Sequence, residues 1–272
     1  AILDASTGHV WTMEHKGDER WSRLLDDLLR SNPRELVFSP RDADREEVRG
    51  MISQLDGVTL SQHTSSKRKG QDSLKKILEV ADLGHIDLGD SPLAMDAAGI
   101  AADYLAAMHI VDSIDFREVE IMQPEGNMVL DQTTLRNLEL TQTLAGEKEG
   151  SLLGAIDKCR TSMGRRTLKQ WILRPLANKS KIEERQDAVA SIARSSKRLD
   201  ELRNCLKGLR DMERLATQLS YNRSGGRDLV AIGLALERMP KLKALCMEVD
   251  DSLLNSLAND LDMLEVMRID IQ

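Results

Sequence analysis

The chain has 272 residues and a formal net charge of −7 at pH 7, with 41% hydrophobic and 31% charged residues. This length suits one large domain or two ordinary ones, and the composition excludes a disordered or collagen-like chain. No apolar stretch approaches the roughly 18–20 residues of a membrane span, so the sequence predicts no membrane partner. The 3 cysteines have neither metal-site spacing nor an even count, which favours a reducing compartment over a disulfide framework.

The charge is distributed unevenly along the chain. Residues 1–125 carry 14 basic and 24 acidic side chains, whereas residues 126–272 carry 24 basic and 21 acidic ones. Within the second part, residues 158–214 hold 16 basic and 7 acidic side chains, a net charge of +9. Such a segment is either a set of solvated helix faces or a surface that faces a polyanion or an acidic domain.

Residues 1–125 predict an α/β domain with a mixed sheet and flanking helices. Strand-like runs cover residues 2–7, 10–15, 35–39 and 58–60, and the first two flank Gly8-His9 as in a hairpin. Helix-like apolar periods cover residues 21–29, 48–55 and 92–109. Asp18 is placed to cap the first of these helices. The polar run 61–70 is expected to be a mobile loop.

Residues 126–272 predict an all-helical domain, because no convincing strand pattern follows Gly126. Ser162 is placed to cap a helix over 163–173, and Ser180 has the capping-box pattern with the glutamate three residues on. Pro240 is expected to end one helix, and the leucines from 253 to 264 predict the last one. These leucine stripes indicate a core rather than a coiled coil, because none keeps heptad spacing over the ~3–4 repeats that a coiled coil needs.

A search for catalytic motifs finds no P-loop, Rossmann fingerprint, HExxH or GxSxG, and the 5 histidines lack metal-site spacing. We therefore predict no catalytic, metal-binding or nucleotide-binding residue in this chain. Asp4 is the one carboxylate that needs a test, because two-metal nucleases of the ribonuclease-H type place an acid on their first strand. The neighbouring strands offer only Glu35 and Asp56. The alternative is that Asp4 accepts hydrogen bonds from backbone amides in the turn to Gly8.

Two features bear on nucleic-acid binding. The tripeptide Lys67-Arg68-Lys69 in the predicted loop is either a phosphate contact or a solvated loop tip. The chain has only 3 Trp, 2 Tyr and 2 Phe, which is too few for a platform on which bases stack.

Six blocks of the second part occur in a characteristic order, at residues 128–140, 150–157, 161–168 (TSMGRRTL), 171–176 (WILRPL), 182–189 and 209–215. Together they resemble the core, or lever, domain of the MutS family of DNA mismatch repair proteins. The first part is similar, more loosely, to the connector domain of that family, at residues 3–8 and 33–36. The residues of this chain that stand at motif positions are Asp131, Asn137, Gly164, Trp171, Pro175, Asp211 and Arg214.

The resemblance implies a fragment with a ribonuclease-H-like connector over 1–125 and a lever over 126–272, cut before the DNA-gripping clamp. It implies no cofactor for this chain, which alone is not expected to be an enzyme, and ATP with Mg²⁺ for a full-length parent that is a DNA-dependent ATPase. The implied partners are mismatched duplex DNA through the parent, a MutL-type protein at the connector, and a second subunit in a dimer. The implied location is the cytoplasm, in association with the nucleoid, if the source is prokaryotic, and the nucleus if the source is eukaryotic.

Within that resemblance, residues 162–174 are expected to form a stiff lever that relays between DNA-binding and ATPase domains. Gly164 is expected to allow a close helix approach, and Trp171 to be a large packing anchor. Arg165, Arg166 and Lys169 are expected to pair with acids of the connector or to reach DNA phosphate. Two alternatives stay open: a metal-dependent nuclease centred on Asp4, and a helical protein-interaction scaffold unrelated to DNA.

Overall fold

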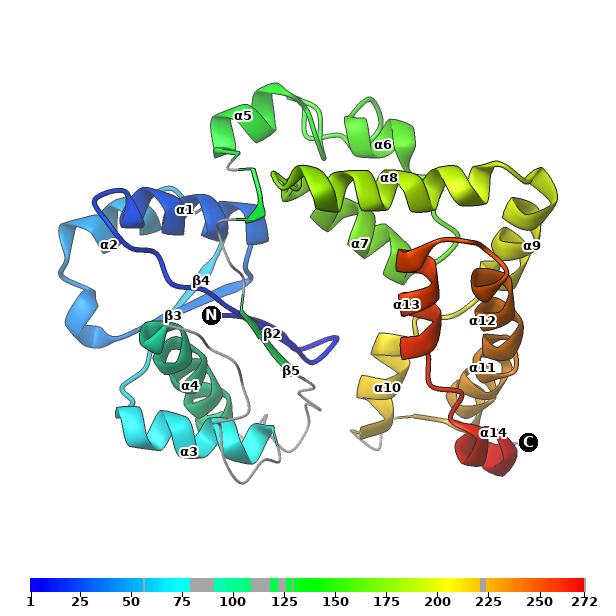
Figure 1. The fold of residues 1–272 in the computed structure, drawn as a ribbon. Coiled ribbons are helices and arrows are strands. Elements are labelled where there is room, and N and C mark those ends of the chain that lie inside the picture. The colour runs from blue at the N-terminus through cyan, green and yellow to red at the C-terminus, as the bar shows by residue number, and fades with distance from the viewer. Residues whose placement is uncertain are drawn as a thin grey trace. The chain divides into compact units, whose positions relative to one another are not determined.

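The computed structural model describes residues 1–55, 57–78, 91–108, 118–121, 126–128, 130–220 and 224–271. The chain divides into two compact units. The first unit comprises residues 1–124 and 130–134, and the second comprises residues 125–129 and 135–272. The chain therefore leaves the first unit, returns to it for five residues and leaves it again. Figure 1 shows strands with helices in the first unit and helices in the second.

The described residues of the first unit form two small sheets. In one, β1 (Ile2–Asp4) pairs antiparallel with β2 (His9–Thr12), and β2 pairs in parallel with β5 (Glu118–Ile121). In the other, β3 (Glu35–Phe38) pairs in parallel with β4 (Thr59–Gln62). The predicted combination of a mixed sheet with helices is thus confirmed. The first hairpin is shorter than predicted. A turn over residues 5–8, with Gly8 at a φ of 71°, replaces the end of the first predicted strand, and the second strand begins at His9 and ends at Thr12 instead of residue 15.

The helices of the first unit are α1 (Arg20–Ser31), the 3₁₀ turn η1 (Pro40–Asp42), α2 (Glu46–Ile52), α3 (Lys67–Ile77) and α4 (Pro92–Ala107). Glu19, not Asp18, holds the N-cap position of α1, and no side chain caps that helix. The core includes Val10 on β2, Leu74 on α3 and Ala98 on α4, each at most 1% exposed. The Thr12 hydroxyl, also buried, donates to the Ala94 carbonyl at 2.6 Å and joins the sheet to α4.

The prediction of a loop over residues 61–70 is wrong. Strand β4 continues to Gln62, and α3 begins at Lys67, where the Ser66 hydroxyl accepts a hydrogen bond from the Lys69 amide at 3.2 Å. The buried face of α3 starts at Gly70 and continues through Leu74 and Ile77, one residue per turn. A polar run conceals this helix because a glycine supplies its first buried position. His109, the predicted end of α4, lies outside the described residues.

The second unit is helical. Its elements follow the segment α5 (Gln132–Asn137) and are α6 (Leu152–Ile156), α7 (Ser162–Leu173), α8 (Lys179–Ala193), α9 (Ser196–Leu206), α10 (Met212–Ser220), α11 (Gly226–Leu236), α12 (Met239–Met247), α13 (Ser252–Asp260) and α14 (Glu265–Ile271). Within its described residues, the only β-pairing is an isolated bridge between Asn127 and Leu176. The prediction of a helical domain after residue 126 is confirmed, with this isolated bridge as its one β-pairing among the described residues.

The apolar faces of these helices form three local clusters. Ala188, Val249 and Leu254 join α8 to α13. A second cluster contains Leu202, Cys205 and Leu245 and joins α9 to α12. The third contains Leu215, Ile232 and Leu236 and joins α10 to α11. The leucine stripes are therefore core positions, as predicted, and Figure 1 shows α11, α12 and α13 side by side.

Several predicted helix ends differ from those observed. Thr161 caps α7 in place of Ser162, and Asn178 caps α8 in place of the Ser180 capping box. Pro240 does not end a helix but stands in the first turn of α12, where a missing amide proton costs nothing. Of the leucines from 253 to 264, only the first three lie in a helix, because α13 ends at Asp260. Leu261 is its C-cap, and Leu264, whose φ is 42°, stands directly before α14.

Candidate functional site

Helix α7 carries two consecutive arginines that point in different directions, because neighbouring helical residues are rotated by roughly 100°. The Arg165 Nε atom lies 2.8 Å from the Asp157 carboxylate. The Lys148 ammonium donates to the same carboxylate oxygen at 2.8 Å. The hydrogen bond from Lys148 is the main reason why the pKa of Asp157 is lowered, against the opposing effect of burial. One face of α7 is thus tied to the segment that precedes it.

Arg166 ties the other face of α7 to the start of α10. Its guanidinium donates to both carboxylate oxygens of Asp211, at 2.7 Å for the Nη2–Oδ1 pair, and also to Glu213. The bidentate pair with Asp211 raises the pKa of Arg166, although desolvation opposes the shift. The same hydrogen bonds lower the pKa of Asp211, whose Oδ1 atom also accepts from the Arg214 amide at 3.4 Å. Asp211 therefore starts α10 and holds α7 with the same carboxylate.

Two expectations about α7 are corrected. Trp171 is 45% exposed rather than a core anchor, and the Arg185 guanidinium of α8 lies 3.8 Å from the centre of its ring. This is a cation–π contact that joins α7 to α8. A β-carbon on Gly164 would meet Thr161 Oγ1 at 3.1 Å and the Cys159 side chain at 3.9 Å, and no other helix. Gly164 thus leaves room for the cap of its own helix, and its amide donates to the Thr161 hydroxyl.

Two of the remaining motif residues, Asp131 and Pro175, make hydrogen bonds at the segment where the chain passes from one unit to the other. Asp131 accepts a hydrogen bond from the Thr134 amide at 2.6 Å and starts α5, which ends at the exposed Asn137. Hydrogen bonds from the side chain and the backbone amide of Thr134 lower the pKa of Asp131. The Pro175 carbonyl accepts from the Met128 amide at 2.7 Å. The residues before Leu130 are thus paired, inside the second unit, with the segment that directly follows α7.

The connection is also held inside the first unit. The Arg30 guanidinium of α1 donates to the Leu130 carbonyl at 2.7 Å and to Asp27 at 2.7 Å. Asp27 lies 2.9 Å from His15 Nε2 as well. Leu130 is therefore bound to α1, whereas Gly126 and Met128 are bound to the residues that follow α7. The sequence alone did not predict this role of Arg30, because Arg30 and Leu130 are separated by 100 positions in the chain.

The three basic residues at 67–69 lie on the first turn of α3. Lys67 is 3.5 Å from Asp96 and Lys69 is 3.2 Å from Asp103, both on α4. Arg68 is exposed and, among the described residues, has no ion pair. Lys169 of α7 is likewise exposed and unpaired within the described ranges. The two lysines of this tripeptide thus serve helix packing, and Arg68 and Lys169 are the two predicted cations that stay available for a ligand.

Asp103 forms a buried polar cluster that sequence inspection did not find. This carboxylate is 2% exposed and lies 2.9 Å from His63 Nε2, while the Ser73 hydroxyl donates to it at 3.2 Å. Burial acts to raise the pKa of Asp103, but hydrogen bonds from His63, Ser65, Lys69 and Ser73 together lower it. The cluster joins the segment before α3 to α4, and no sequence motif marks it.

The nuclease hypothesis has no support. Asp4 accepts hydrogen bonds from the Ser6 amide at 2.9 Å and the Ser6 hydroxyl at 2.6 Å, as the turn interpretation predicted. Glu35 accepts from the hydroxyls of Ser61 and Tyr104 instead of facing Asp4. Asp56 lies outside the described residues. Within the described ranges, no group of three or more His, Cys, Asp or Glu side chains is arranged to hold a metal ion.

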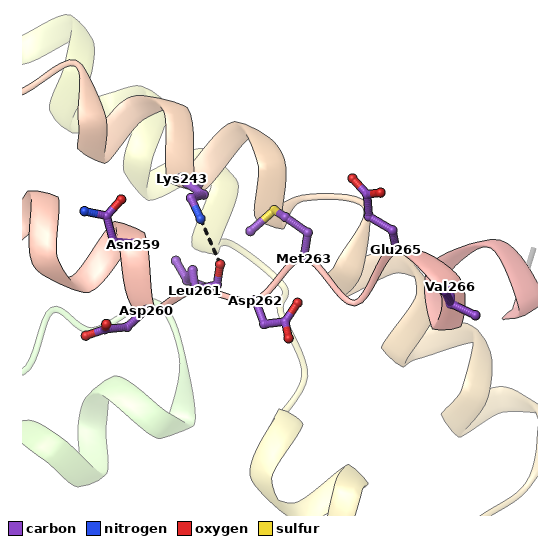
Figure 2. Close-up of a pocket in the computed structure, with 8 residues that line it drawn as sticks. All are labelled: Lys243, Asn259, Asp260, Leu261, Asp262, Met263, Glu265 and Val266. Atoms are coloured by element: carbon purple, nitrogen blue, oxygen red, sulfur yellow. Dashed lines mark hydrogen bonds between the residues drawn. The ribbon is translucent and has the colours of Figure 1, made fainter.

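A pocket of about 610 Å³ lies where α13 gives way to α14 (Figure 2). Figure 2 shows three carboxylates around it, those of Asp260, Asp262 and Glu265. The one ammonium group, that of Lys243, donates to the Leu261 carbonyl at 3.0 Å. An acidic lining with its cation engaged in this way repels phosphate groups. The pocket therefore offers no phosphate site.

Two family domains match this chain. MutS domain II matches residues 1–110 and MutS domain III matches residues 133–270, which is half of the chain by itself. The chain belongs to the MutS family of DNA mismatch repair proteins. The resemblance inferred from the six blocks and from the first part is thus confirmed.

Curated MutS proteins are similar along most of this chain. The DNA mismatch repair protein MutS of Symbiobacterium thermophilum is 32% identical over 272 residues, which cover 98% of this chain and 31% of that protein. That of Myxococcus xanthus is 33% identical over 269 residues, which cover 97% of this chain and 30% of that protein. This MutS-family chain therefore spans less than a third of the length of these relatives. Among the described helices, none combines the length and the apolar character that a membrane span requires.

Proposed function

We propose that this chain is the structural and allosteric relay of a longer mismatch-recognition ATPase. The observation that carries the proposal is the Arg166–Asp211–Glu213 network, which fixes helix α7 to α10 through a bidentate pair. A relay needs a stiff element whose packing two distant sites can bias, with a coupling free energy of roughly 1–3 kcal/mol. Helix α7 has the required stiffness because ion pairs hold it on two faces.

The second support is the connection between the units. Leu130 is bound to α1 through Arg30, and residues 126 and 128 are bound to Ala177 and Pro175, directly after α7. A displacement of α7 therefore acts directly on the segment that enters the first unit. The same short segment is thus hydrogen-bonded within each unit, to Arg30 in the first and to Pro175 and Ala177 in the second.

The proposal includes the finer expectations about the parent protein. The first unit is a ribonuclease-H-like connector that docks a MutL-type partner. The parent is a dimer that binds mismatched duplex DNA, and its ATPase domain, outside this chain, holds ATP and Mg²⁺. Its location is the nucleoid of a bacterial cell or the nucleus of a eukaryotic one. The resemblance to MutS proteins supports each of these points.

The relay is tested in the full-length parent with Asp211→Asn. This change removes the charge that Arg166 faces while keeping the shape of the side chain. We expect the DNA affinity and the ATPase rate without DNA to stay as in the wild type, whereas the stimulation of the ATPase by mismatched DNA falls severalfold. Asp187→Asn, the same chemical change at an exposed aspartate of α8, is the matched control and leaves the stimulation unchanged. Equal stimulation in Asp211→Asn and wild type would contradict the relay.

A further inference from the structure

A second, smaller pocket lies beside the end of α9. It has a volume of about 250 Å³ and is lined by Arg160, Asp200, Arg203, Asn204 and Lys207. Arg160 precedes the cap of α7, and the other four residues belong to the last two turns of α9 and its C-cap. Three cations and one carboxylate therefore surround a space that fits a phosphodiester group. All five residues belong to the second unit.

The cations of this pocket are available, unlike those at the start of α7. Arg160 and Lys207 are exposed, and within the described ranges neither side chain has an ion pair. Arg203 has a single long contact of 3.9 Å with Asp200, in which both side chains are largely exposed. Such a contact is worth little in water. By contrast, Arg165 and Arg166 are held by carboxylates at hydrogen-bond distance.

The end of α9 would normally disfavour an anion, because the last carbonyls of a helix carry partial negative charge. Here the Arg238 guanidinium donates to the Lys207 carbonyl at 2.6 Å and to the Cys205 carbonyl at 3.4 Å. This arginine neutralises the helix end and adds a fourth positive charge next to the pocket. The segment 158–214, with its net charge of +9, supplies a favourable long-range field.

We propose that this pocket binds a phosphate group of the DNA backbone, with Arg160, Arg203 and Lys207 as donors. The proposal rests on the proposed function for its choice of duplex DNA as the partner. Arginine and lysine together with an amide side chain are the usual donors to backbone phosphate. The pocket has no aromatic side chain on which a base could stack, so the proposed contact is to the DNA backbone and not to a base. It would fix the position of a duplex alongside the helical unit.

The test measures how salt weakens the binding of this chain to a labelled 30-base-pair matched duplex, by fluorescence anisotropy. Each lost phosphate contact makes the slope of log K against log salt shallower by about 0.9. The double variant Arg160→Gln/Lys207→Gln is therefore expected to have a slope shallower by about 1.8. Between 50 and 200 mM salt, the wild type would then lose about 12-fold more affinity than the variant.

Two further variants separate this site from general positive charge. Asp200→Asn removes the one carboxylate of the pocket and should tighten DNA binding at every salt concentration. Lys181→Gln removes an exposed charge of α8 outside the pocket and should keep the wild-type slope. Thermal unfolding of each variant establishes that it is folded. The gain in DNA affinity expected for Asp200→Asn is measured independently of the loss expected for the double variant.

The proposal is overturned if the double variant keeps the wild-type slope. It is likewise overturned if Lys181→Gln makes the slope shallower by as much as each of the two substitutions of the double variant does. It is also overturned if the double variant loses binding to a labelled polyglutamate peptide while its DNA slope stays unchanged, which would make the pocket a site for acidic protein. The relay proposal is tested independently, because its measurement is the stimulation of the ATPase in the full-length parent.

Discussion

Gly70 of α3 and Gly99 of α4 meet backbone to backbone. A β-carbon on Gly70 would lie 2.9 Å from the Gly99 carbonyl carbon, and one on Gly99 would lie 2.8 Å from that of Gly70. The two ion pairs from Lys67 and Lys69 to α4 flank this crossing. The start of α3 can thus be polar, because close backbone packing and charge pairing replace the usual apolar contacts.

Gly99→Ala is expected to destabilise the first unit by about 1–3 kcal/mol, because the added methyl group forces the helices apart. The measurement is urea unfolding of the chain. Gly50→Ala in α2 is the matched control, since nothing lies within 4 Å of its β-carbon position. That change should be neutral or stabilising by up to about 1 kcal/mol. Equal effects of the two changes would show that the crossing is not close.

Periodicity alone predicted the helical second unit, the strands near residues 36 and 60, and the leucine faces that form the cores. These features depend on local apolar spacing, which sequence records directly. Helix α3 was not predicted, because its first buried position is a glycine, Gly70, which adds nothing to an apolar pattern. The prediction that Trp171 is a buried anchor was wrong, because large aromatic residues are buried on average but this one is not. Its contact with Arg185 of α8 depends on how the two helices pack, which the sequence does not record.

The candidate site was predictable in composition but not in pairing. The family motifs drew attention to Arg166, Asp211 and Arg214, yet the partner of Arg166 lies 45 residues away. Asp157 and Glu213 stand within the matching blocks, but nothing in their spacing assigns them to an arginine. The pocket at the end of α9 combines Arg160 with residues about 40 positions later, so only the folded chain brings its charges together.

Ser66→Ala is expected to destabilise α3 by about 1 kcal/mol, because the Ser66 hydroxyl satisfies the Lys69 amide at the start of the helix. Ser66→Asp keeps an oxygen acceptor at that position and should retain most of the stability. Hydrogen exchange of the amides in the first turn of α3 measures the effect locally. Equal protection in Ser66→Ala and wild type would exclude this cap.

Trp171 and Arg185 are expected to be coupled by about 0.5–1 kcal/mol, the usual range for an exposed cation–π pair. A double-mutant cycle of Trp171→Leu and Arg185→Gln, followed by urea unfolding, isolates this coupling from the packing of each side chain. Trp171→Leu alone should cost less than the roughly 3–5 kcal/mol lost when a fully buried tryptophan is truncated to alanine. A coupling of zero would show that the stack does not join α7 to α8.

Arg166→Gln is expected to destabilise the second unit by about 1–3 kcal/mol, because it leaves the half-buried Asp211 and Glu213 carboxylates without their common partner. Arg165→Gln is the comparison on the same helix, and it should cost less, because Lys148 still neutralises Asp157. The free energy of urea unfolding measures both. An equal loss in the two variants would contradict the special position of Arg166.

Acid is expected to destabilise the first unit through Asp103, whose pKa is lower in the folded protein than its ordinary value. A carboxyl with a lowered folded pKa contributes its full stability above the unfolded pKa of about 3.9. That contribution is lost as the pH falls through the folded pKa. Ser73→Ala removes one donor but keeps the carboxylate, so it should bring the folded pKa closer to the ordinary value and reduce the acid-dependent part of the stability. Urea unfolding between about pH 5 and pH 2.5 measures this dependence, and an identical pH profile in Ser73→Ala and wild type would contradict the assignment.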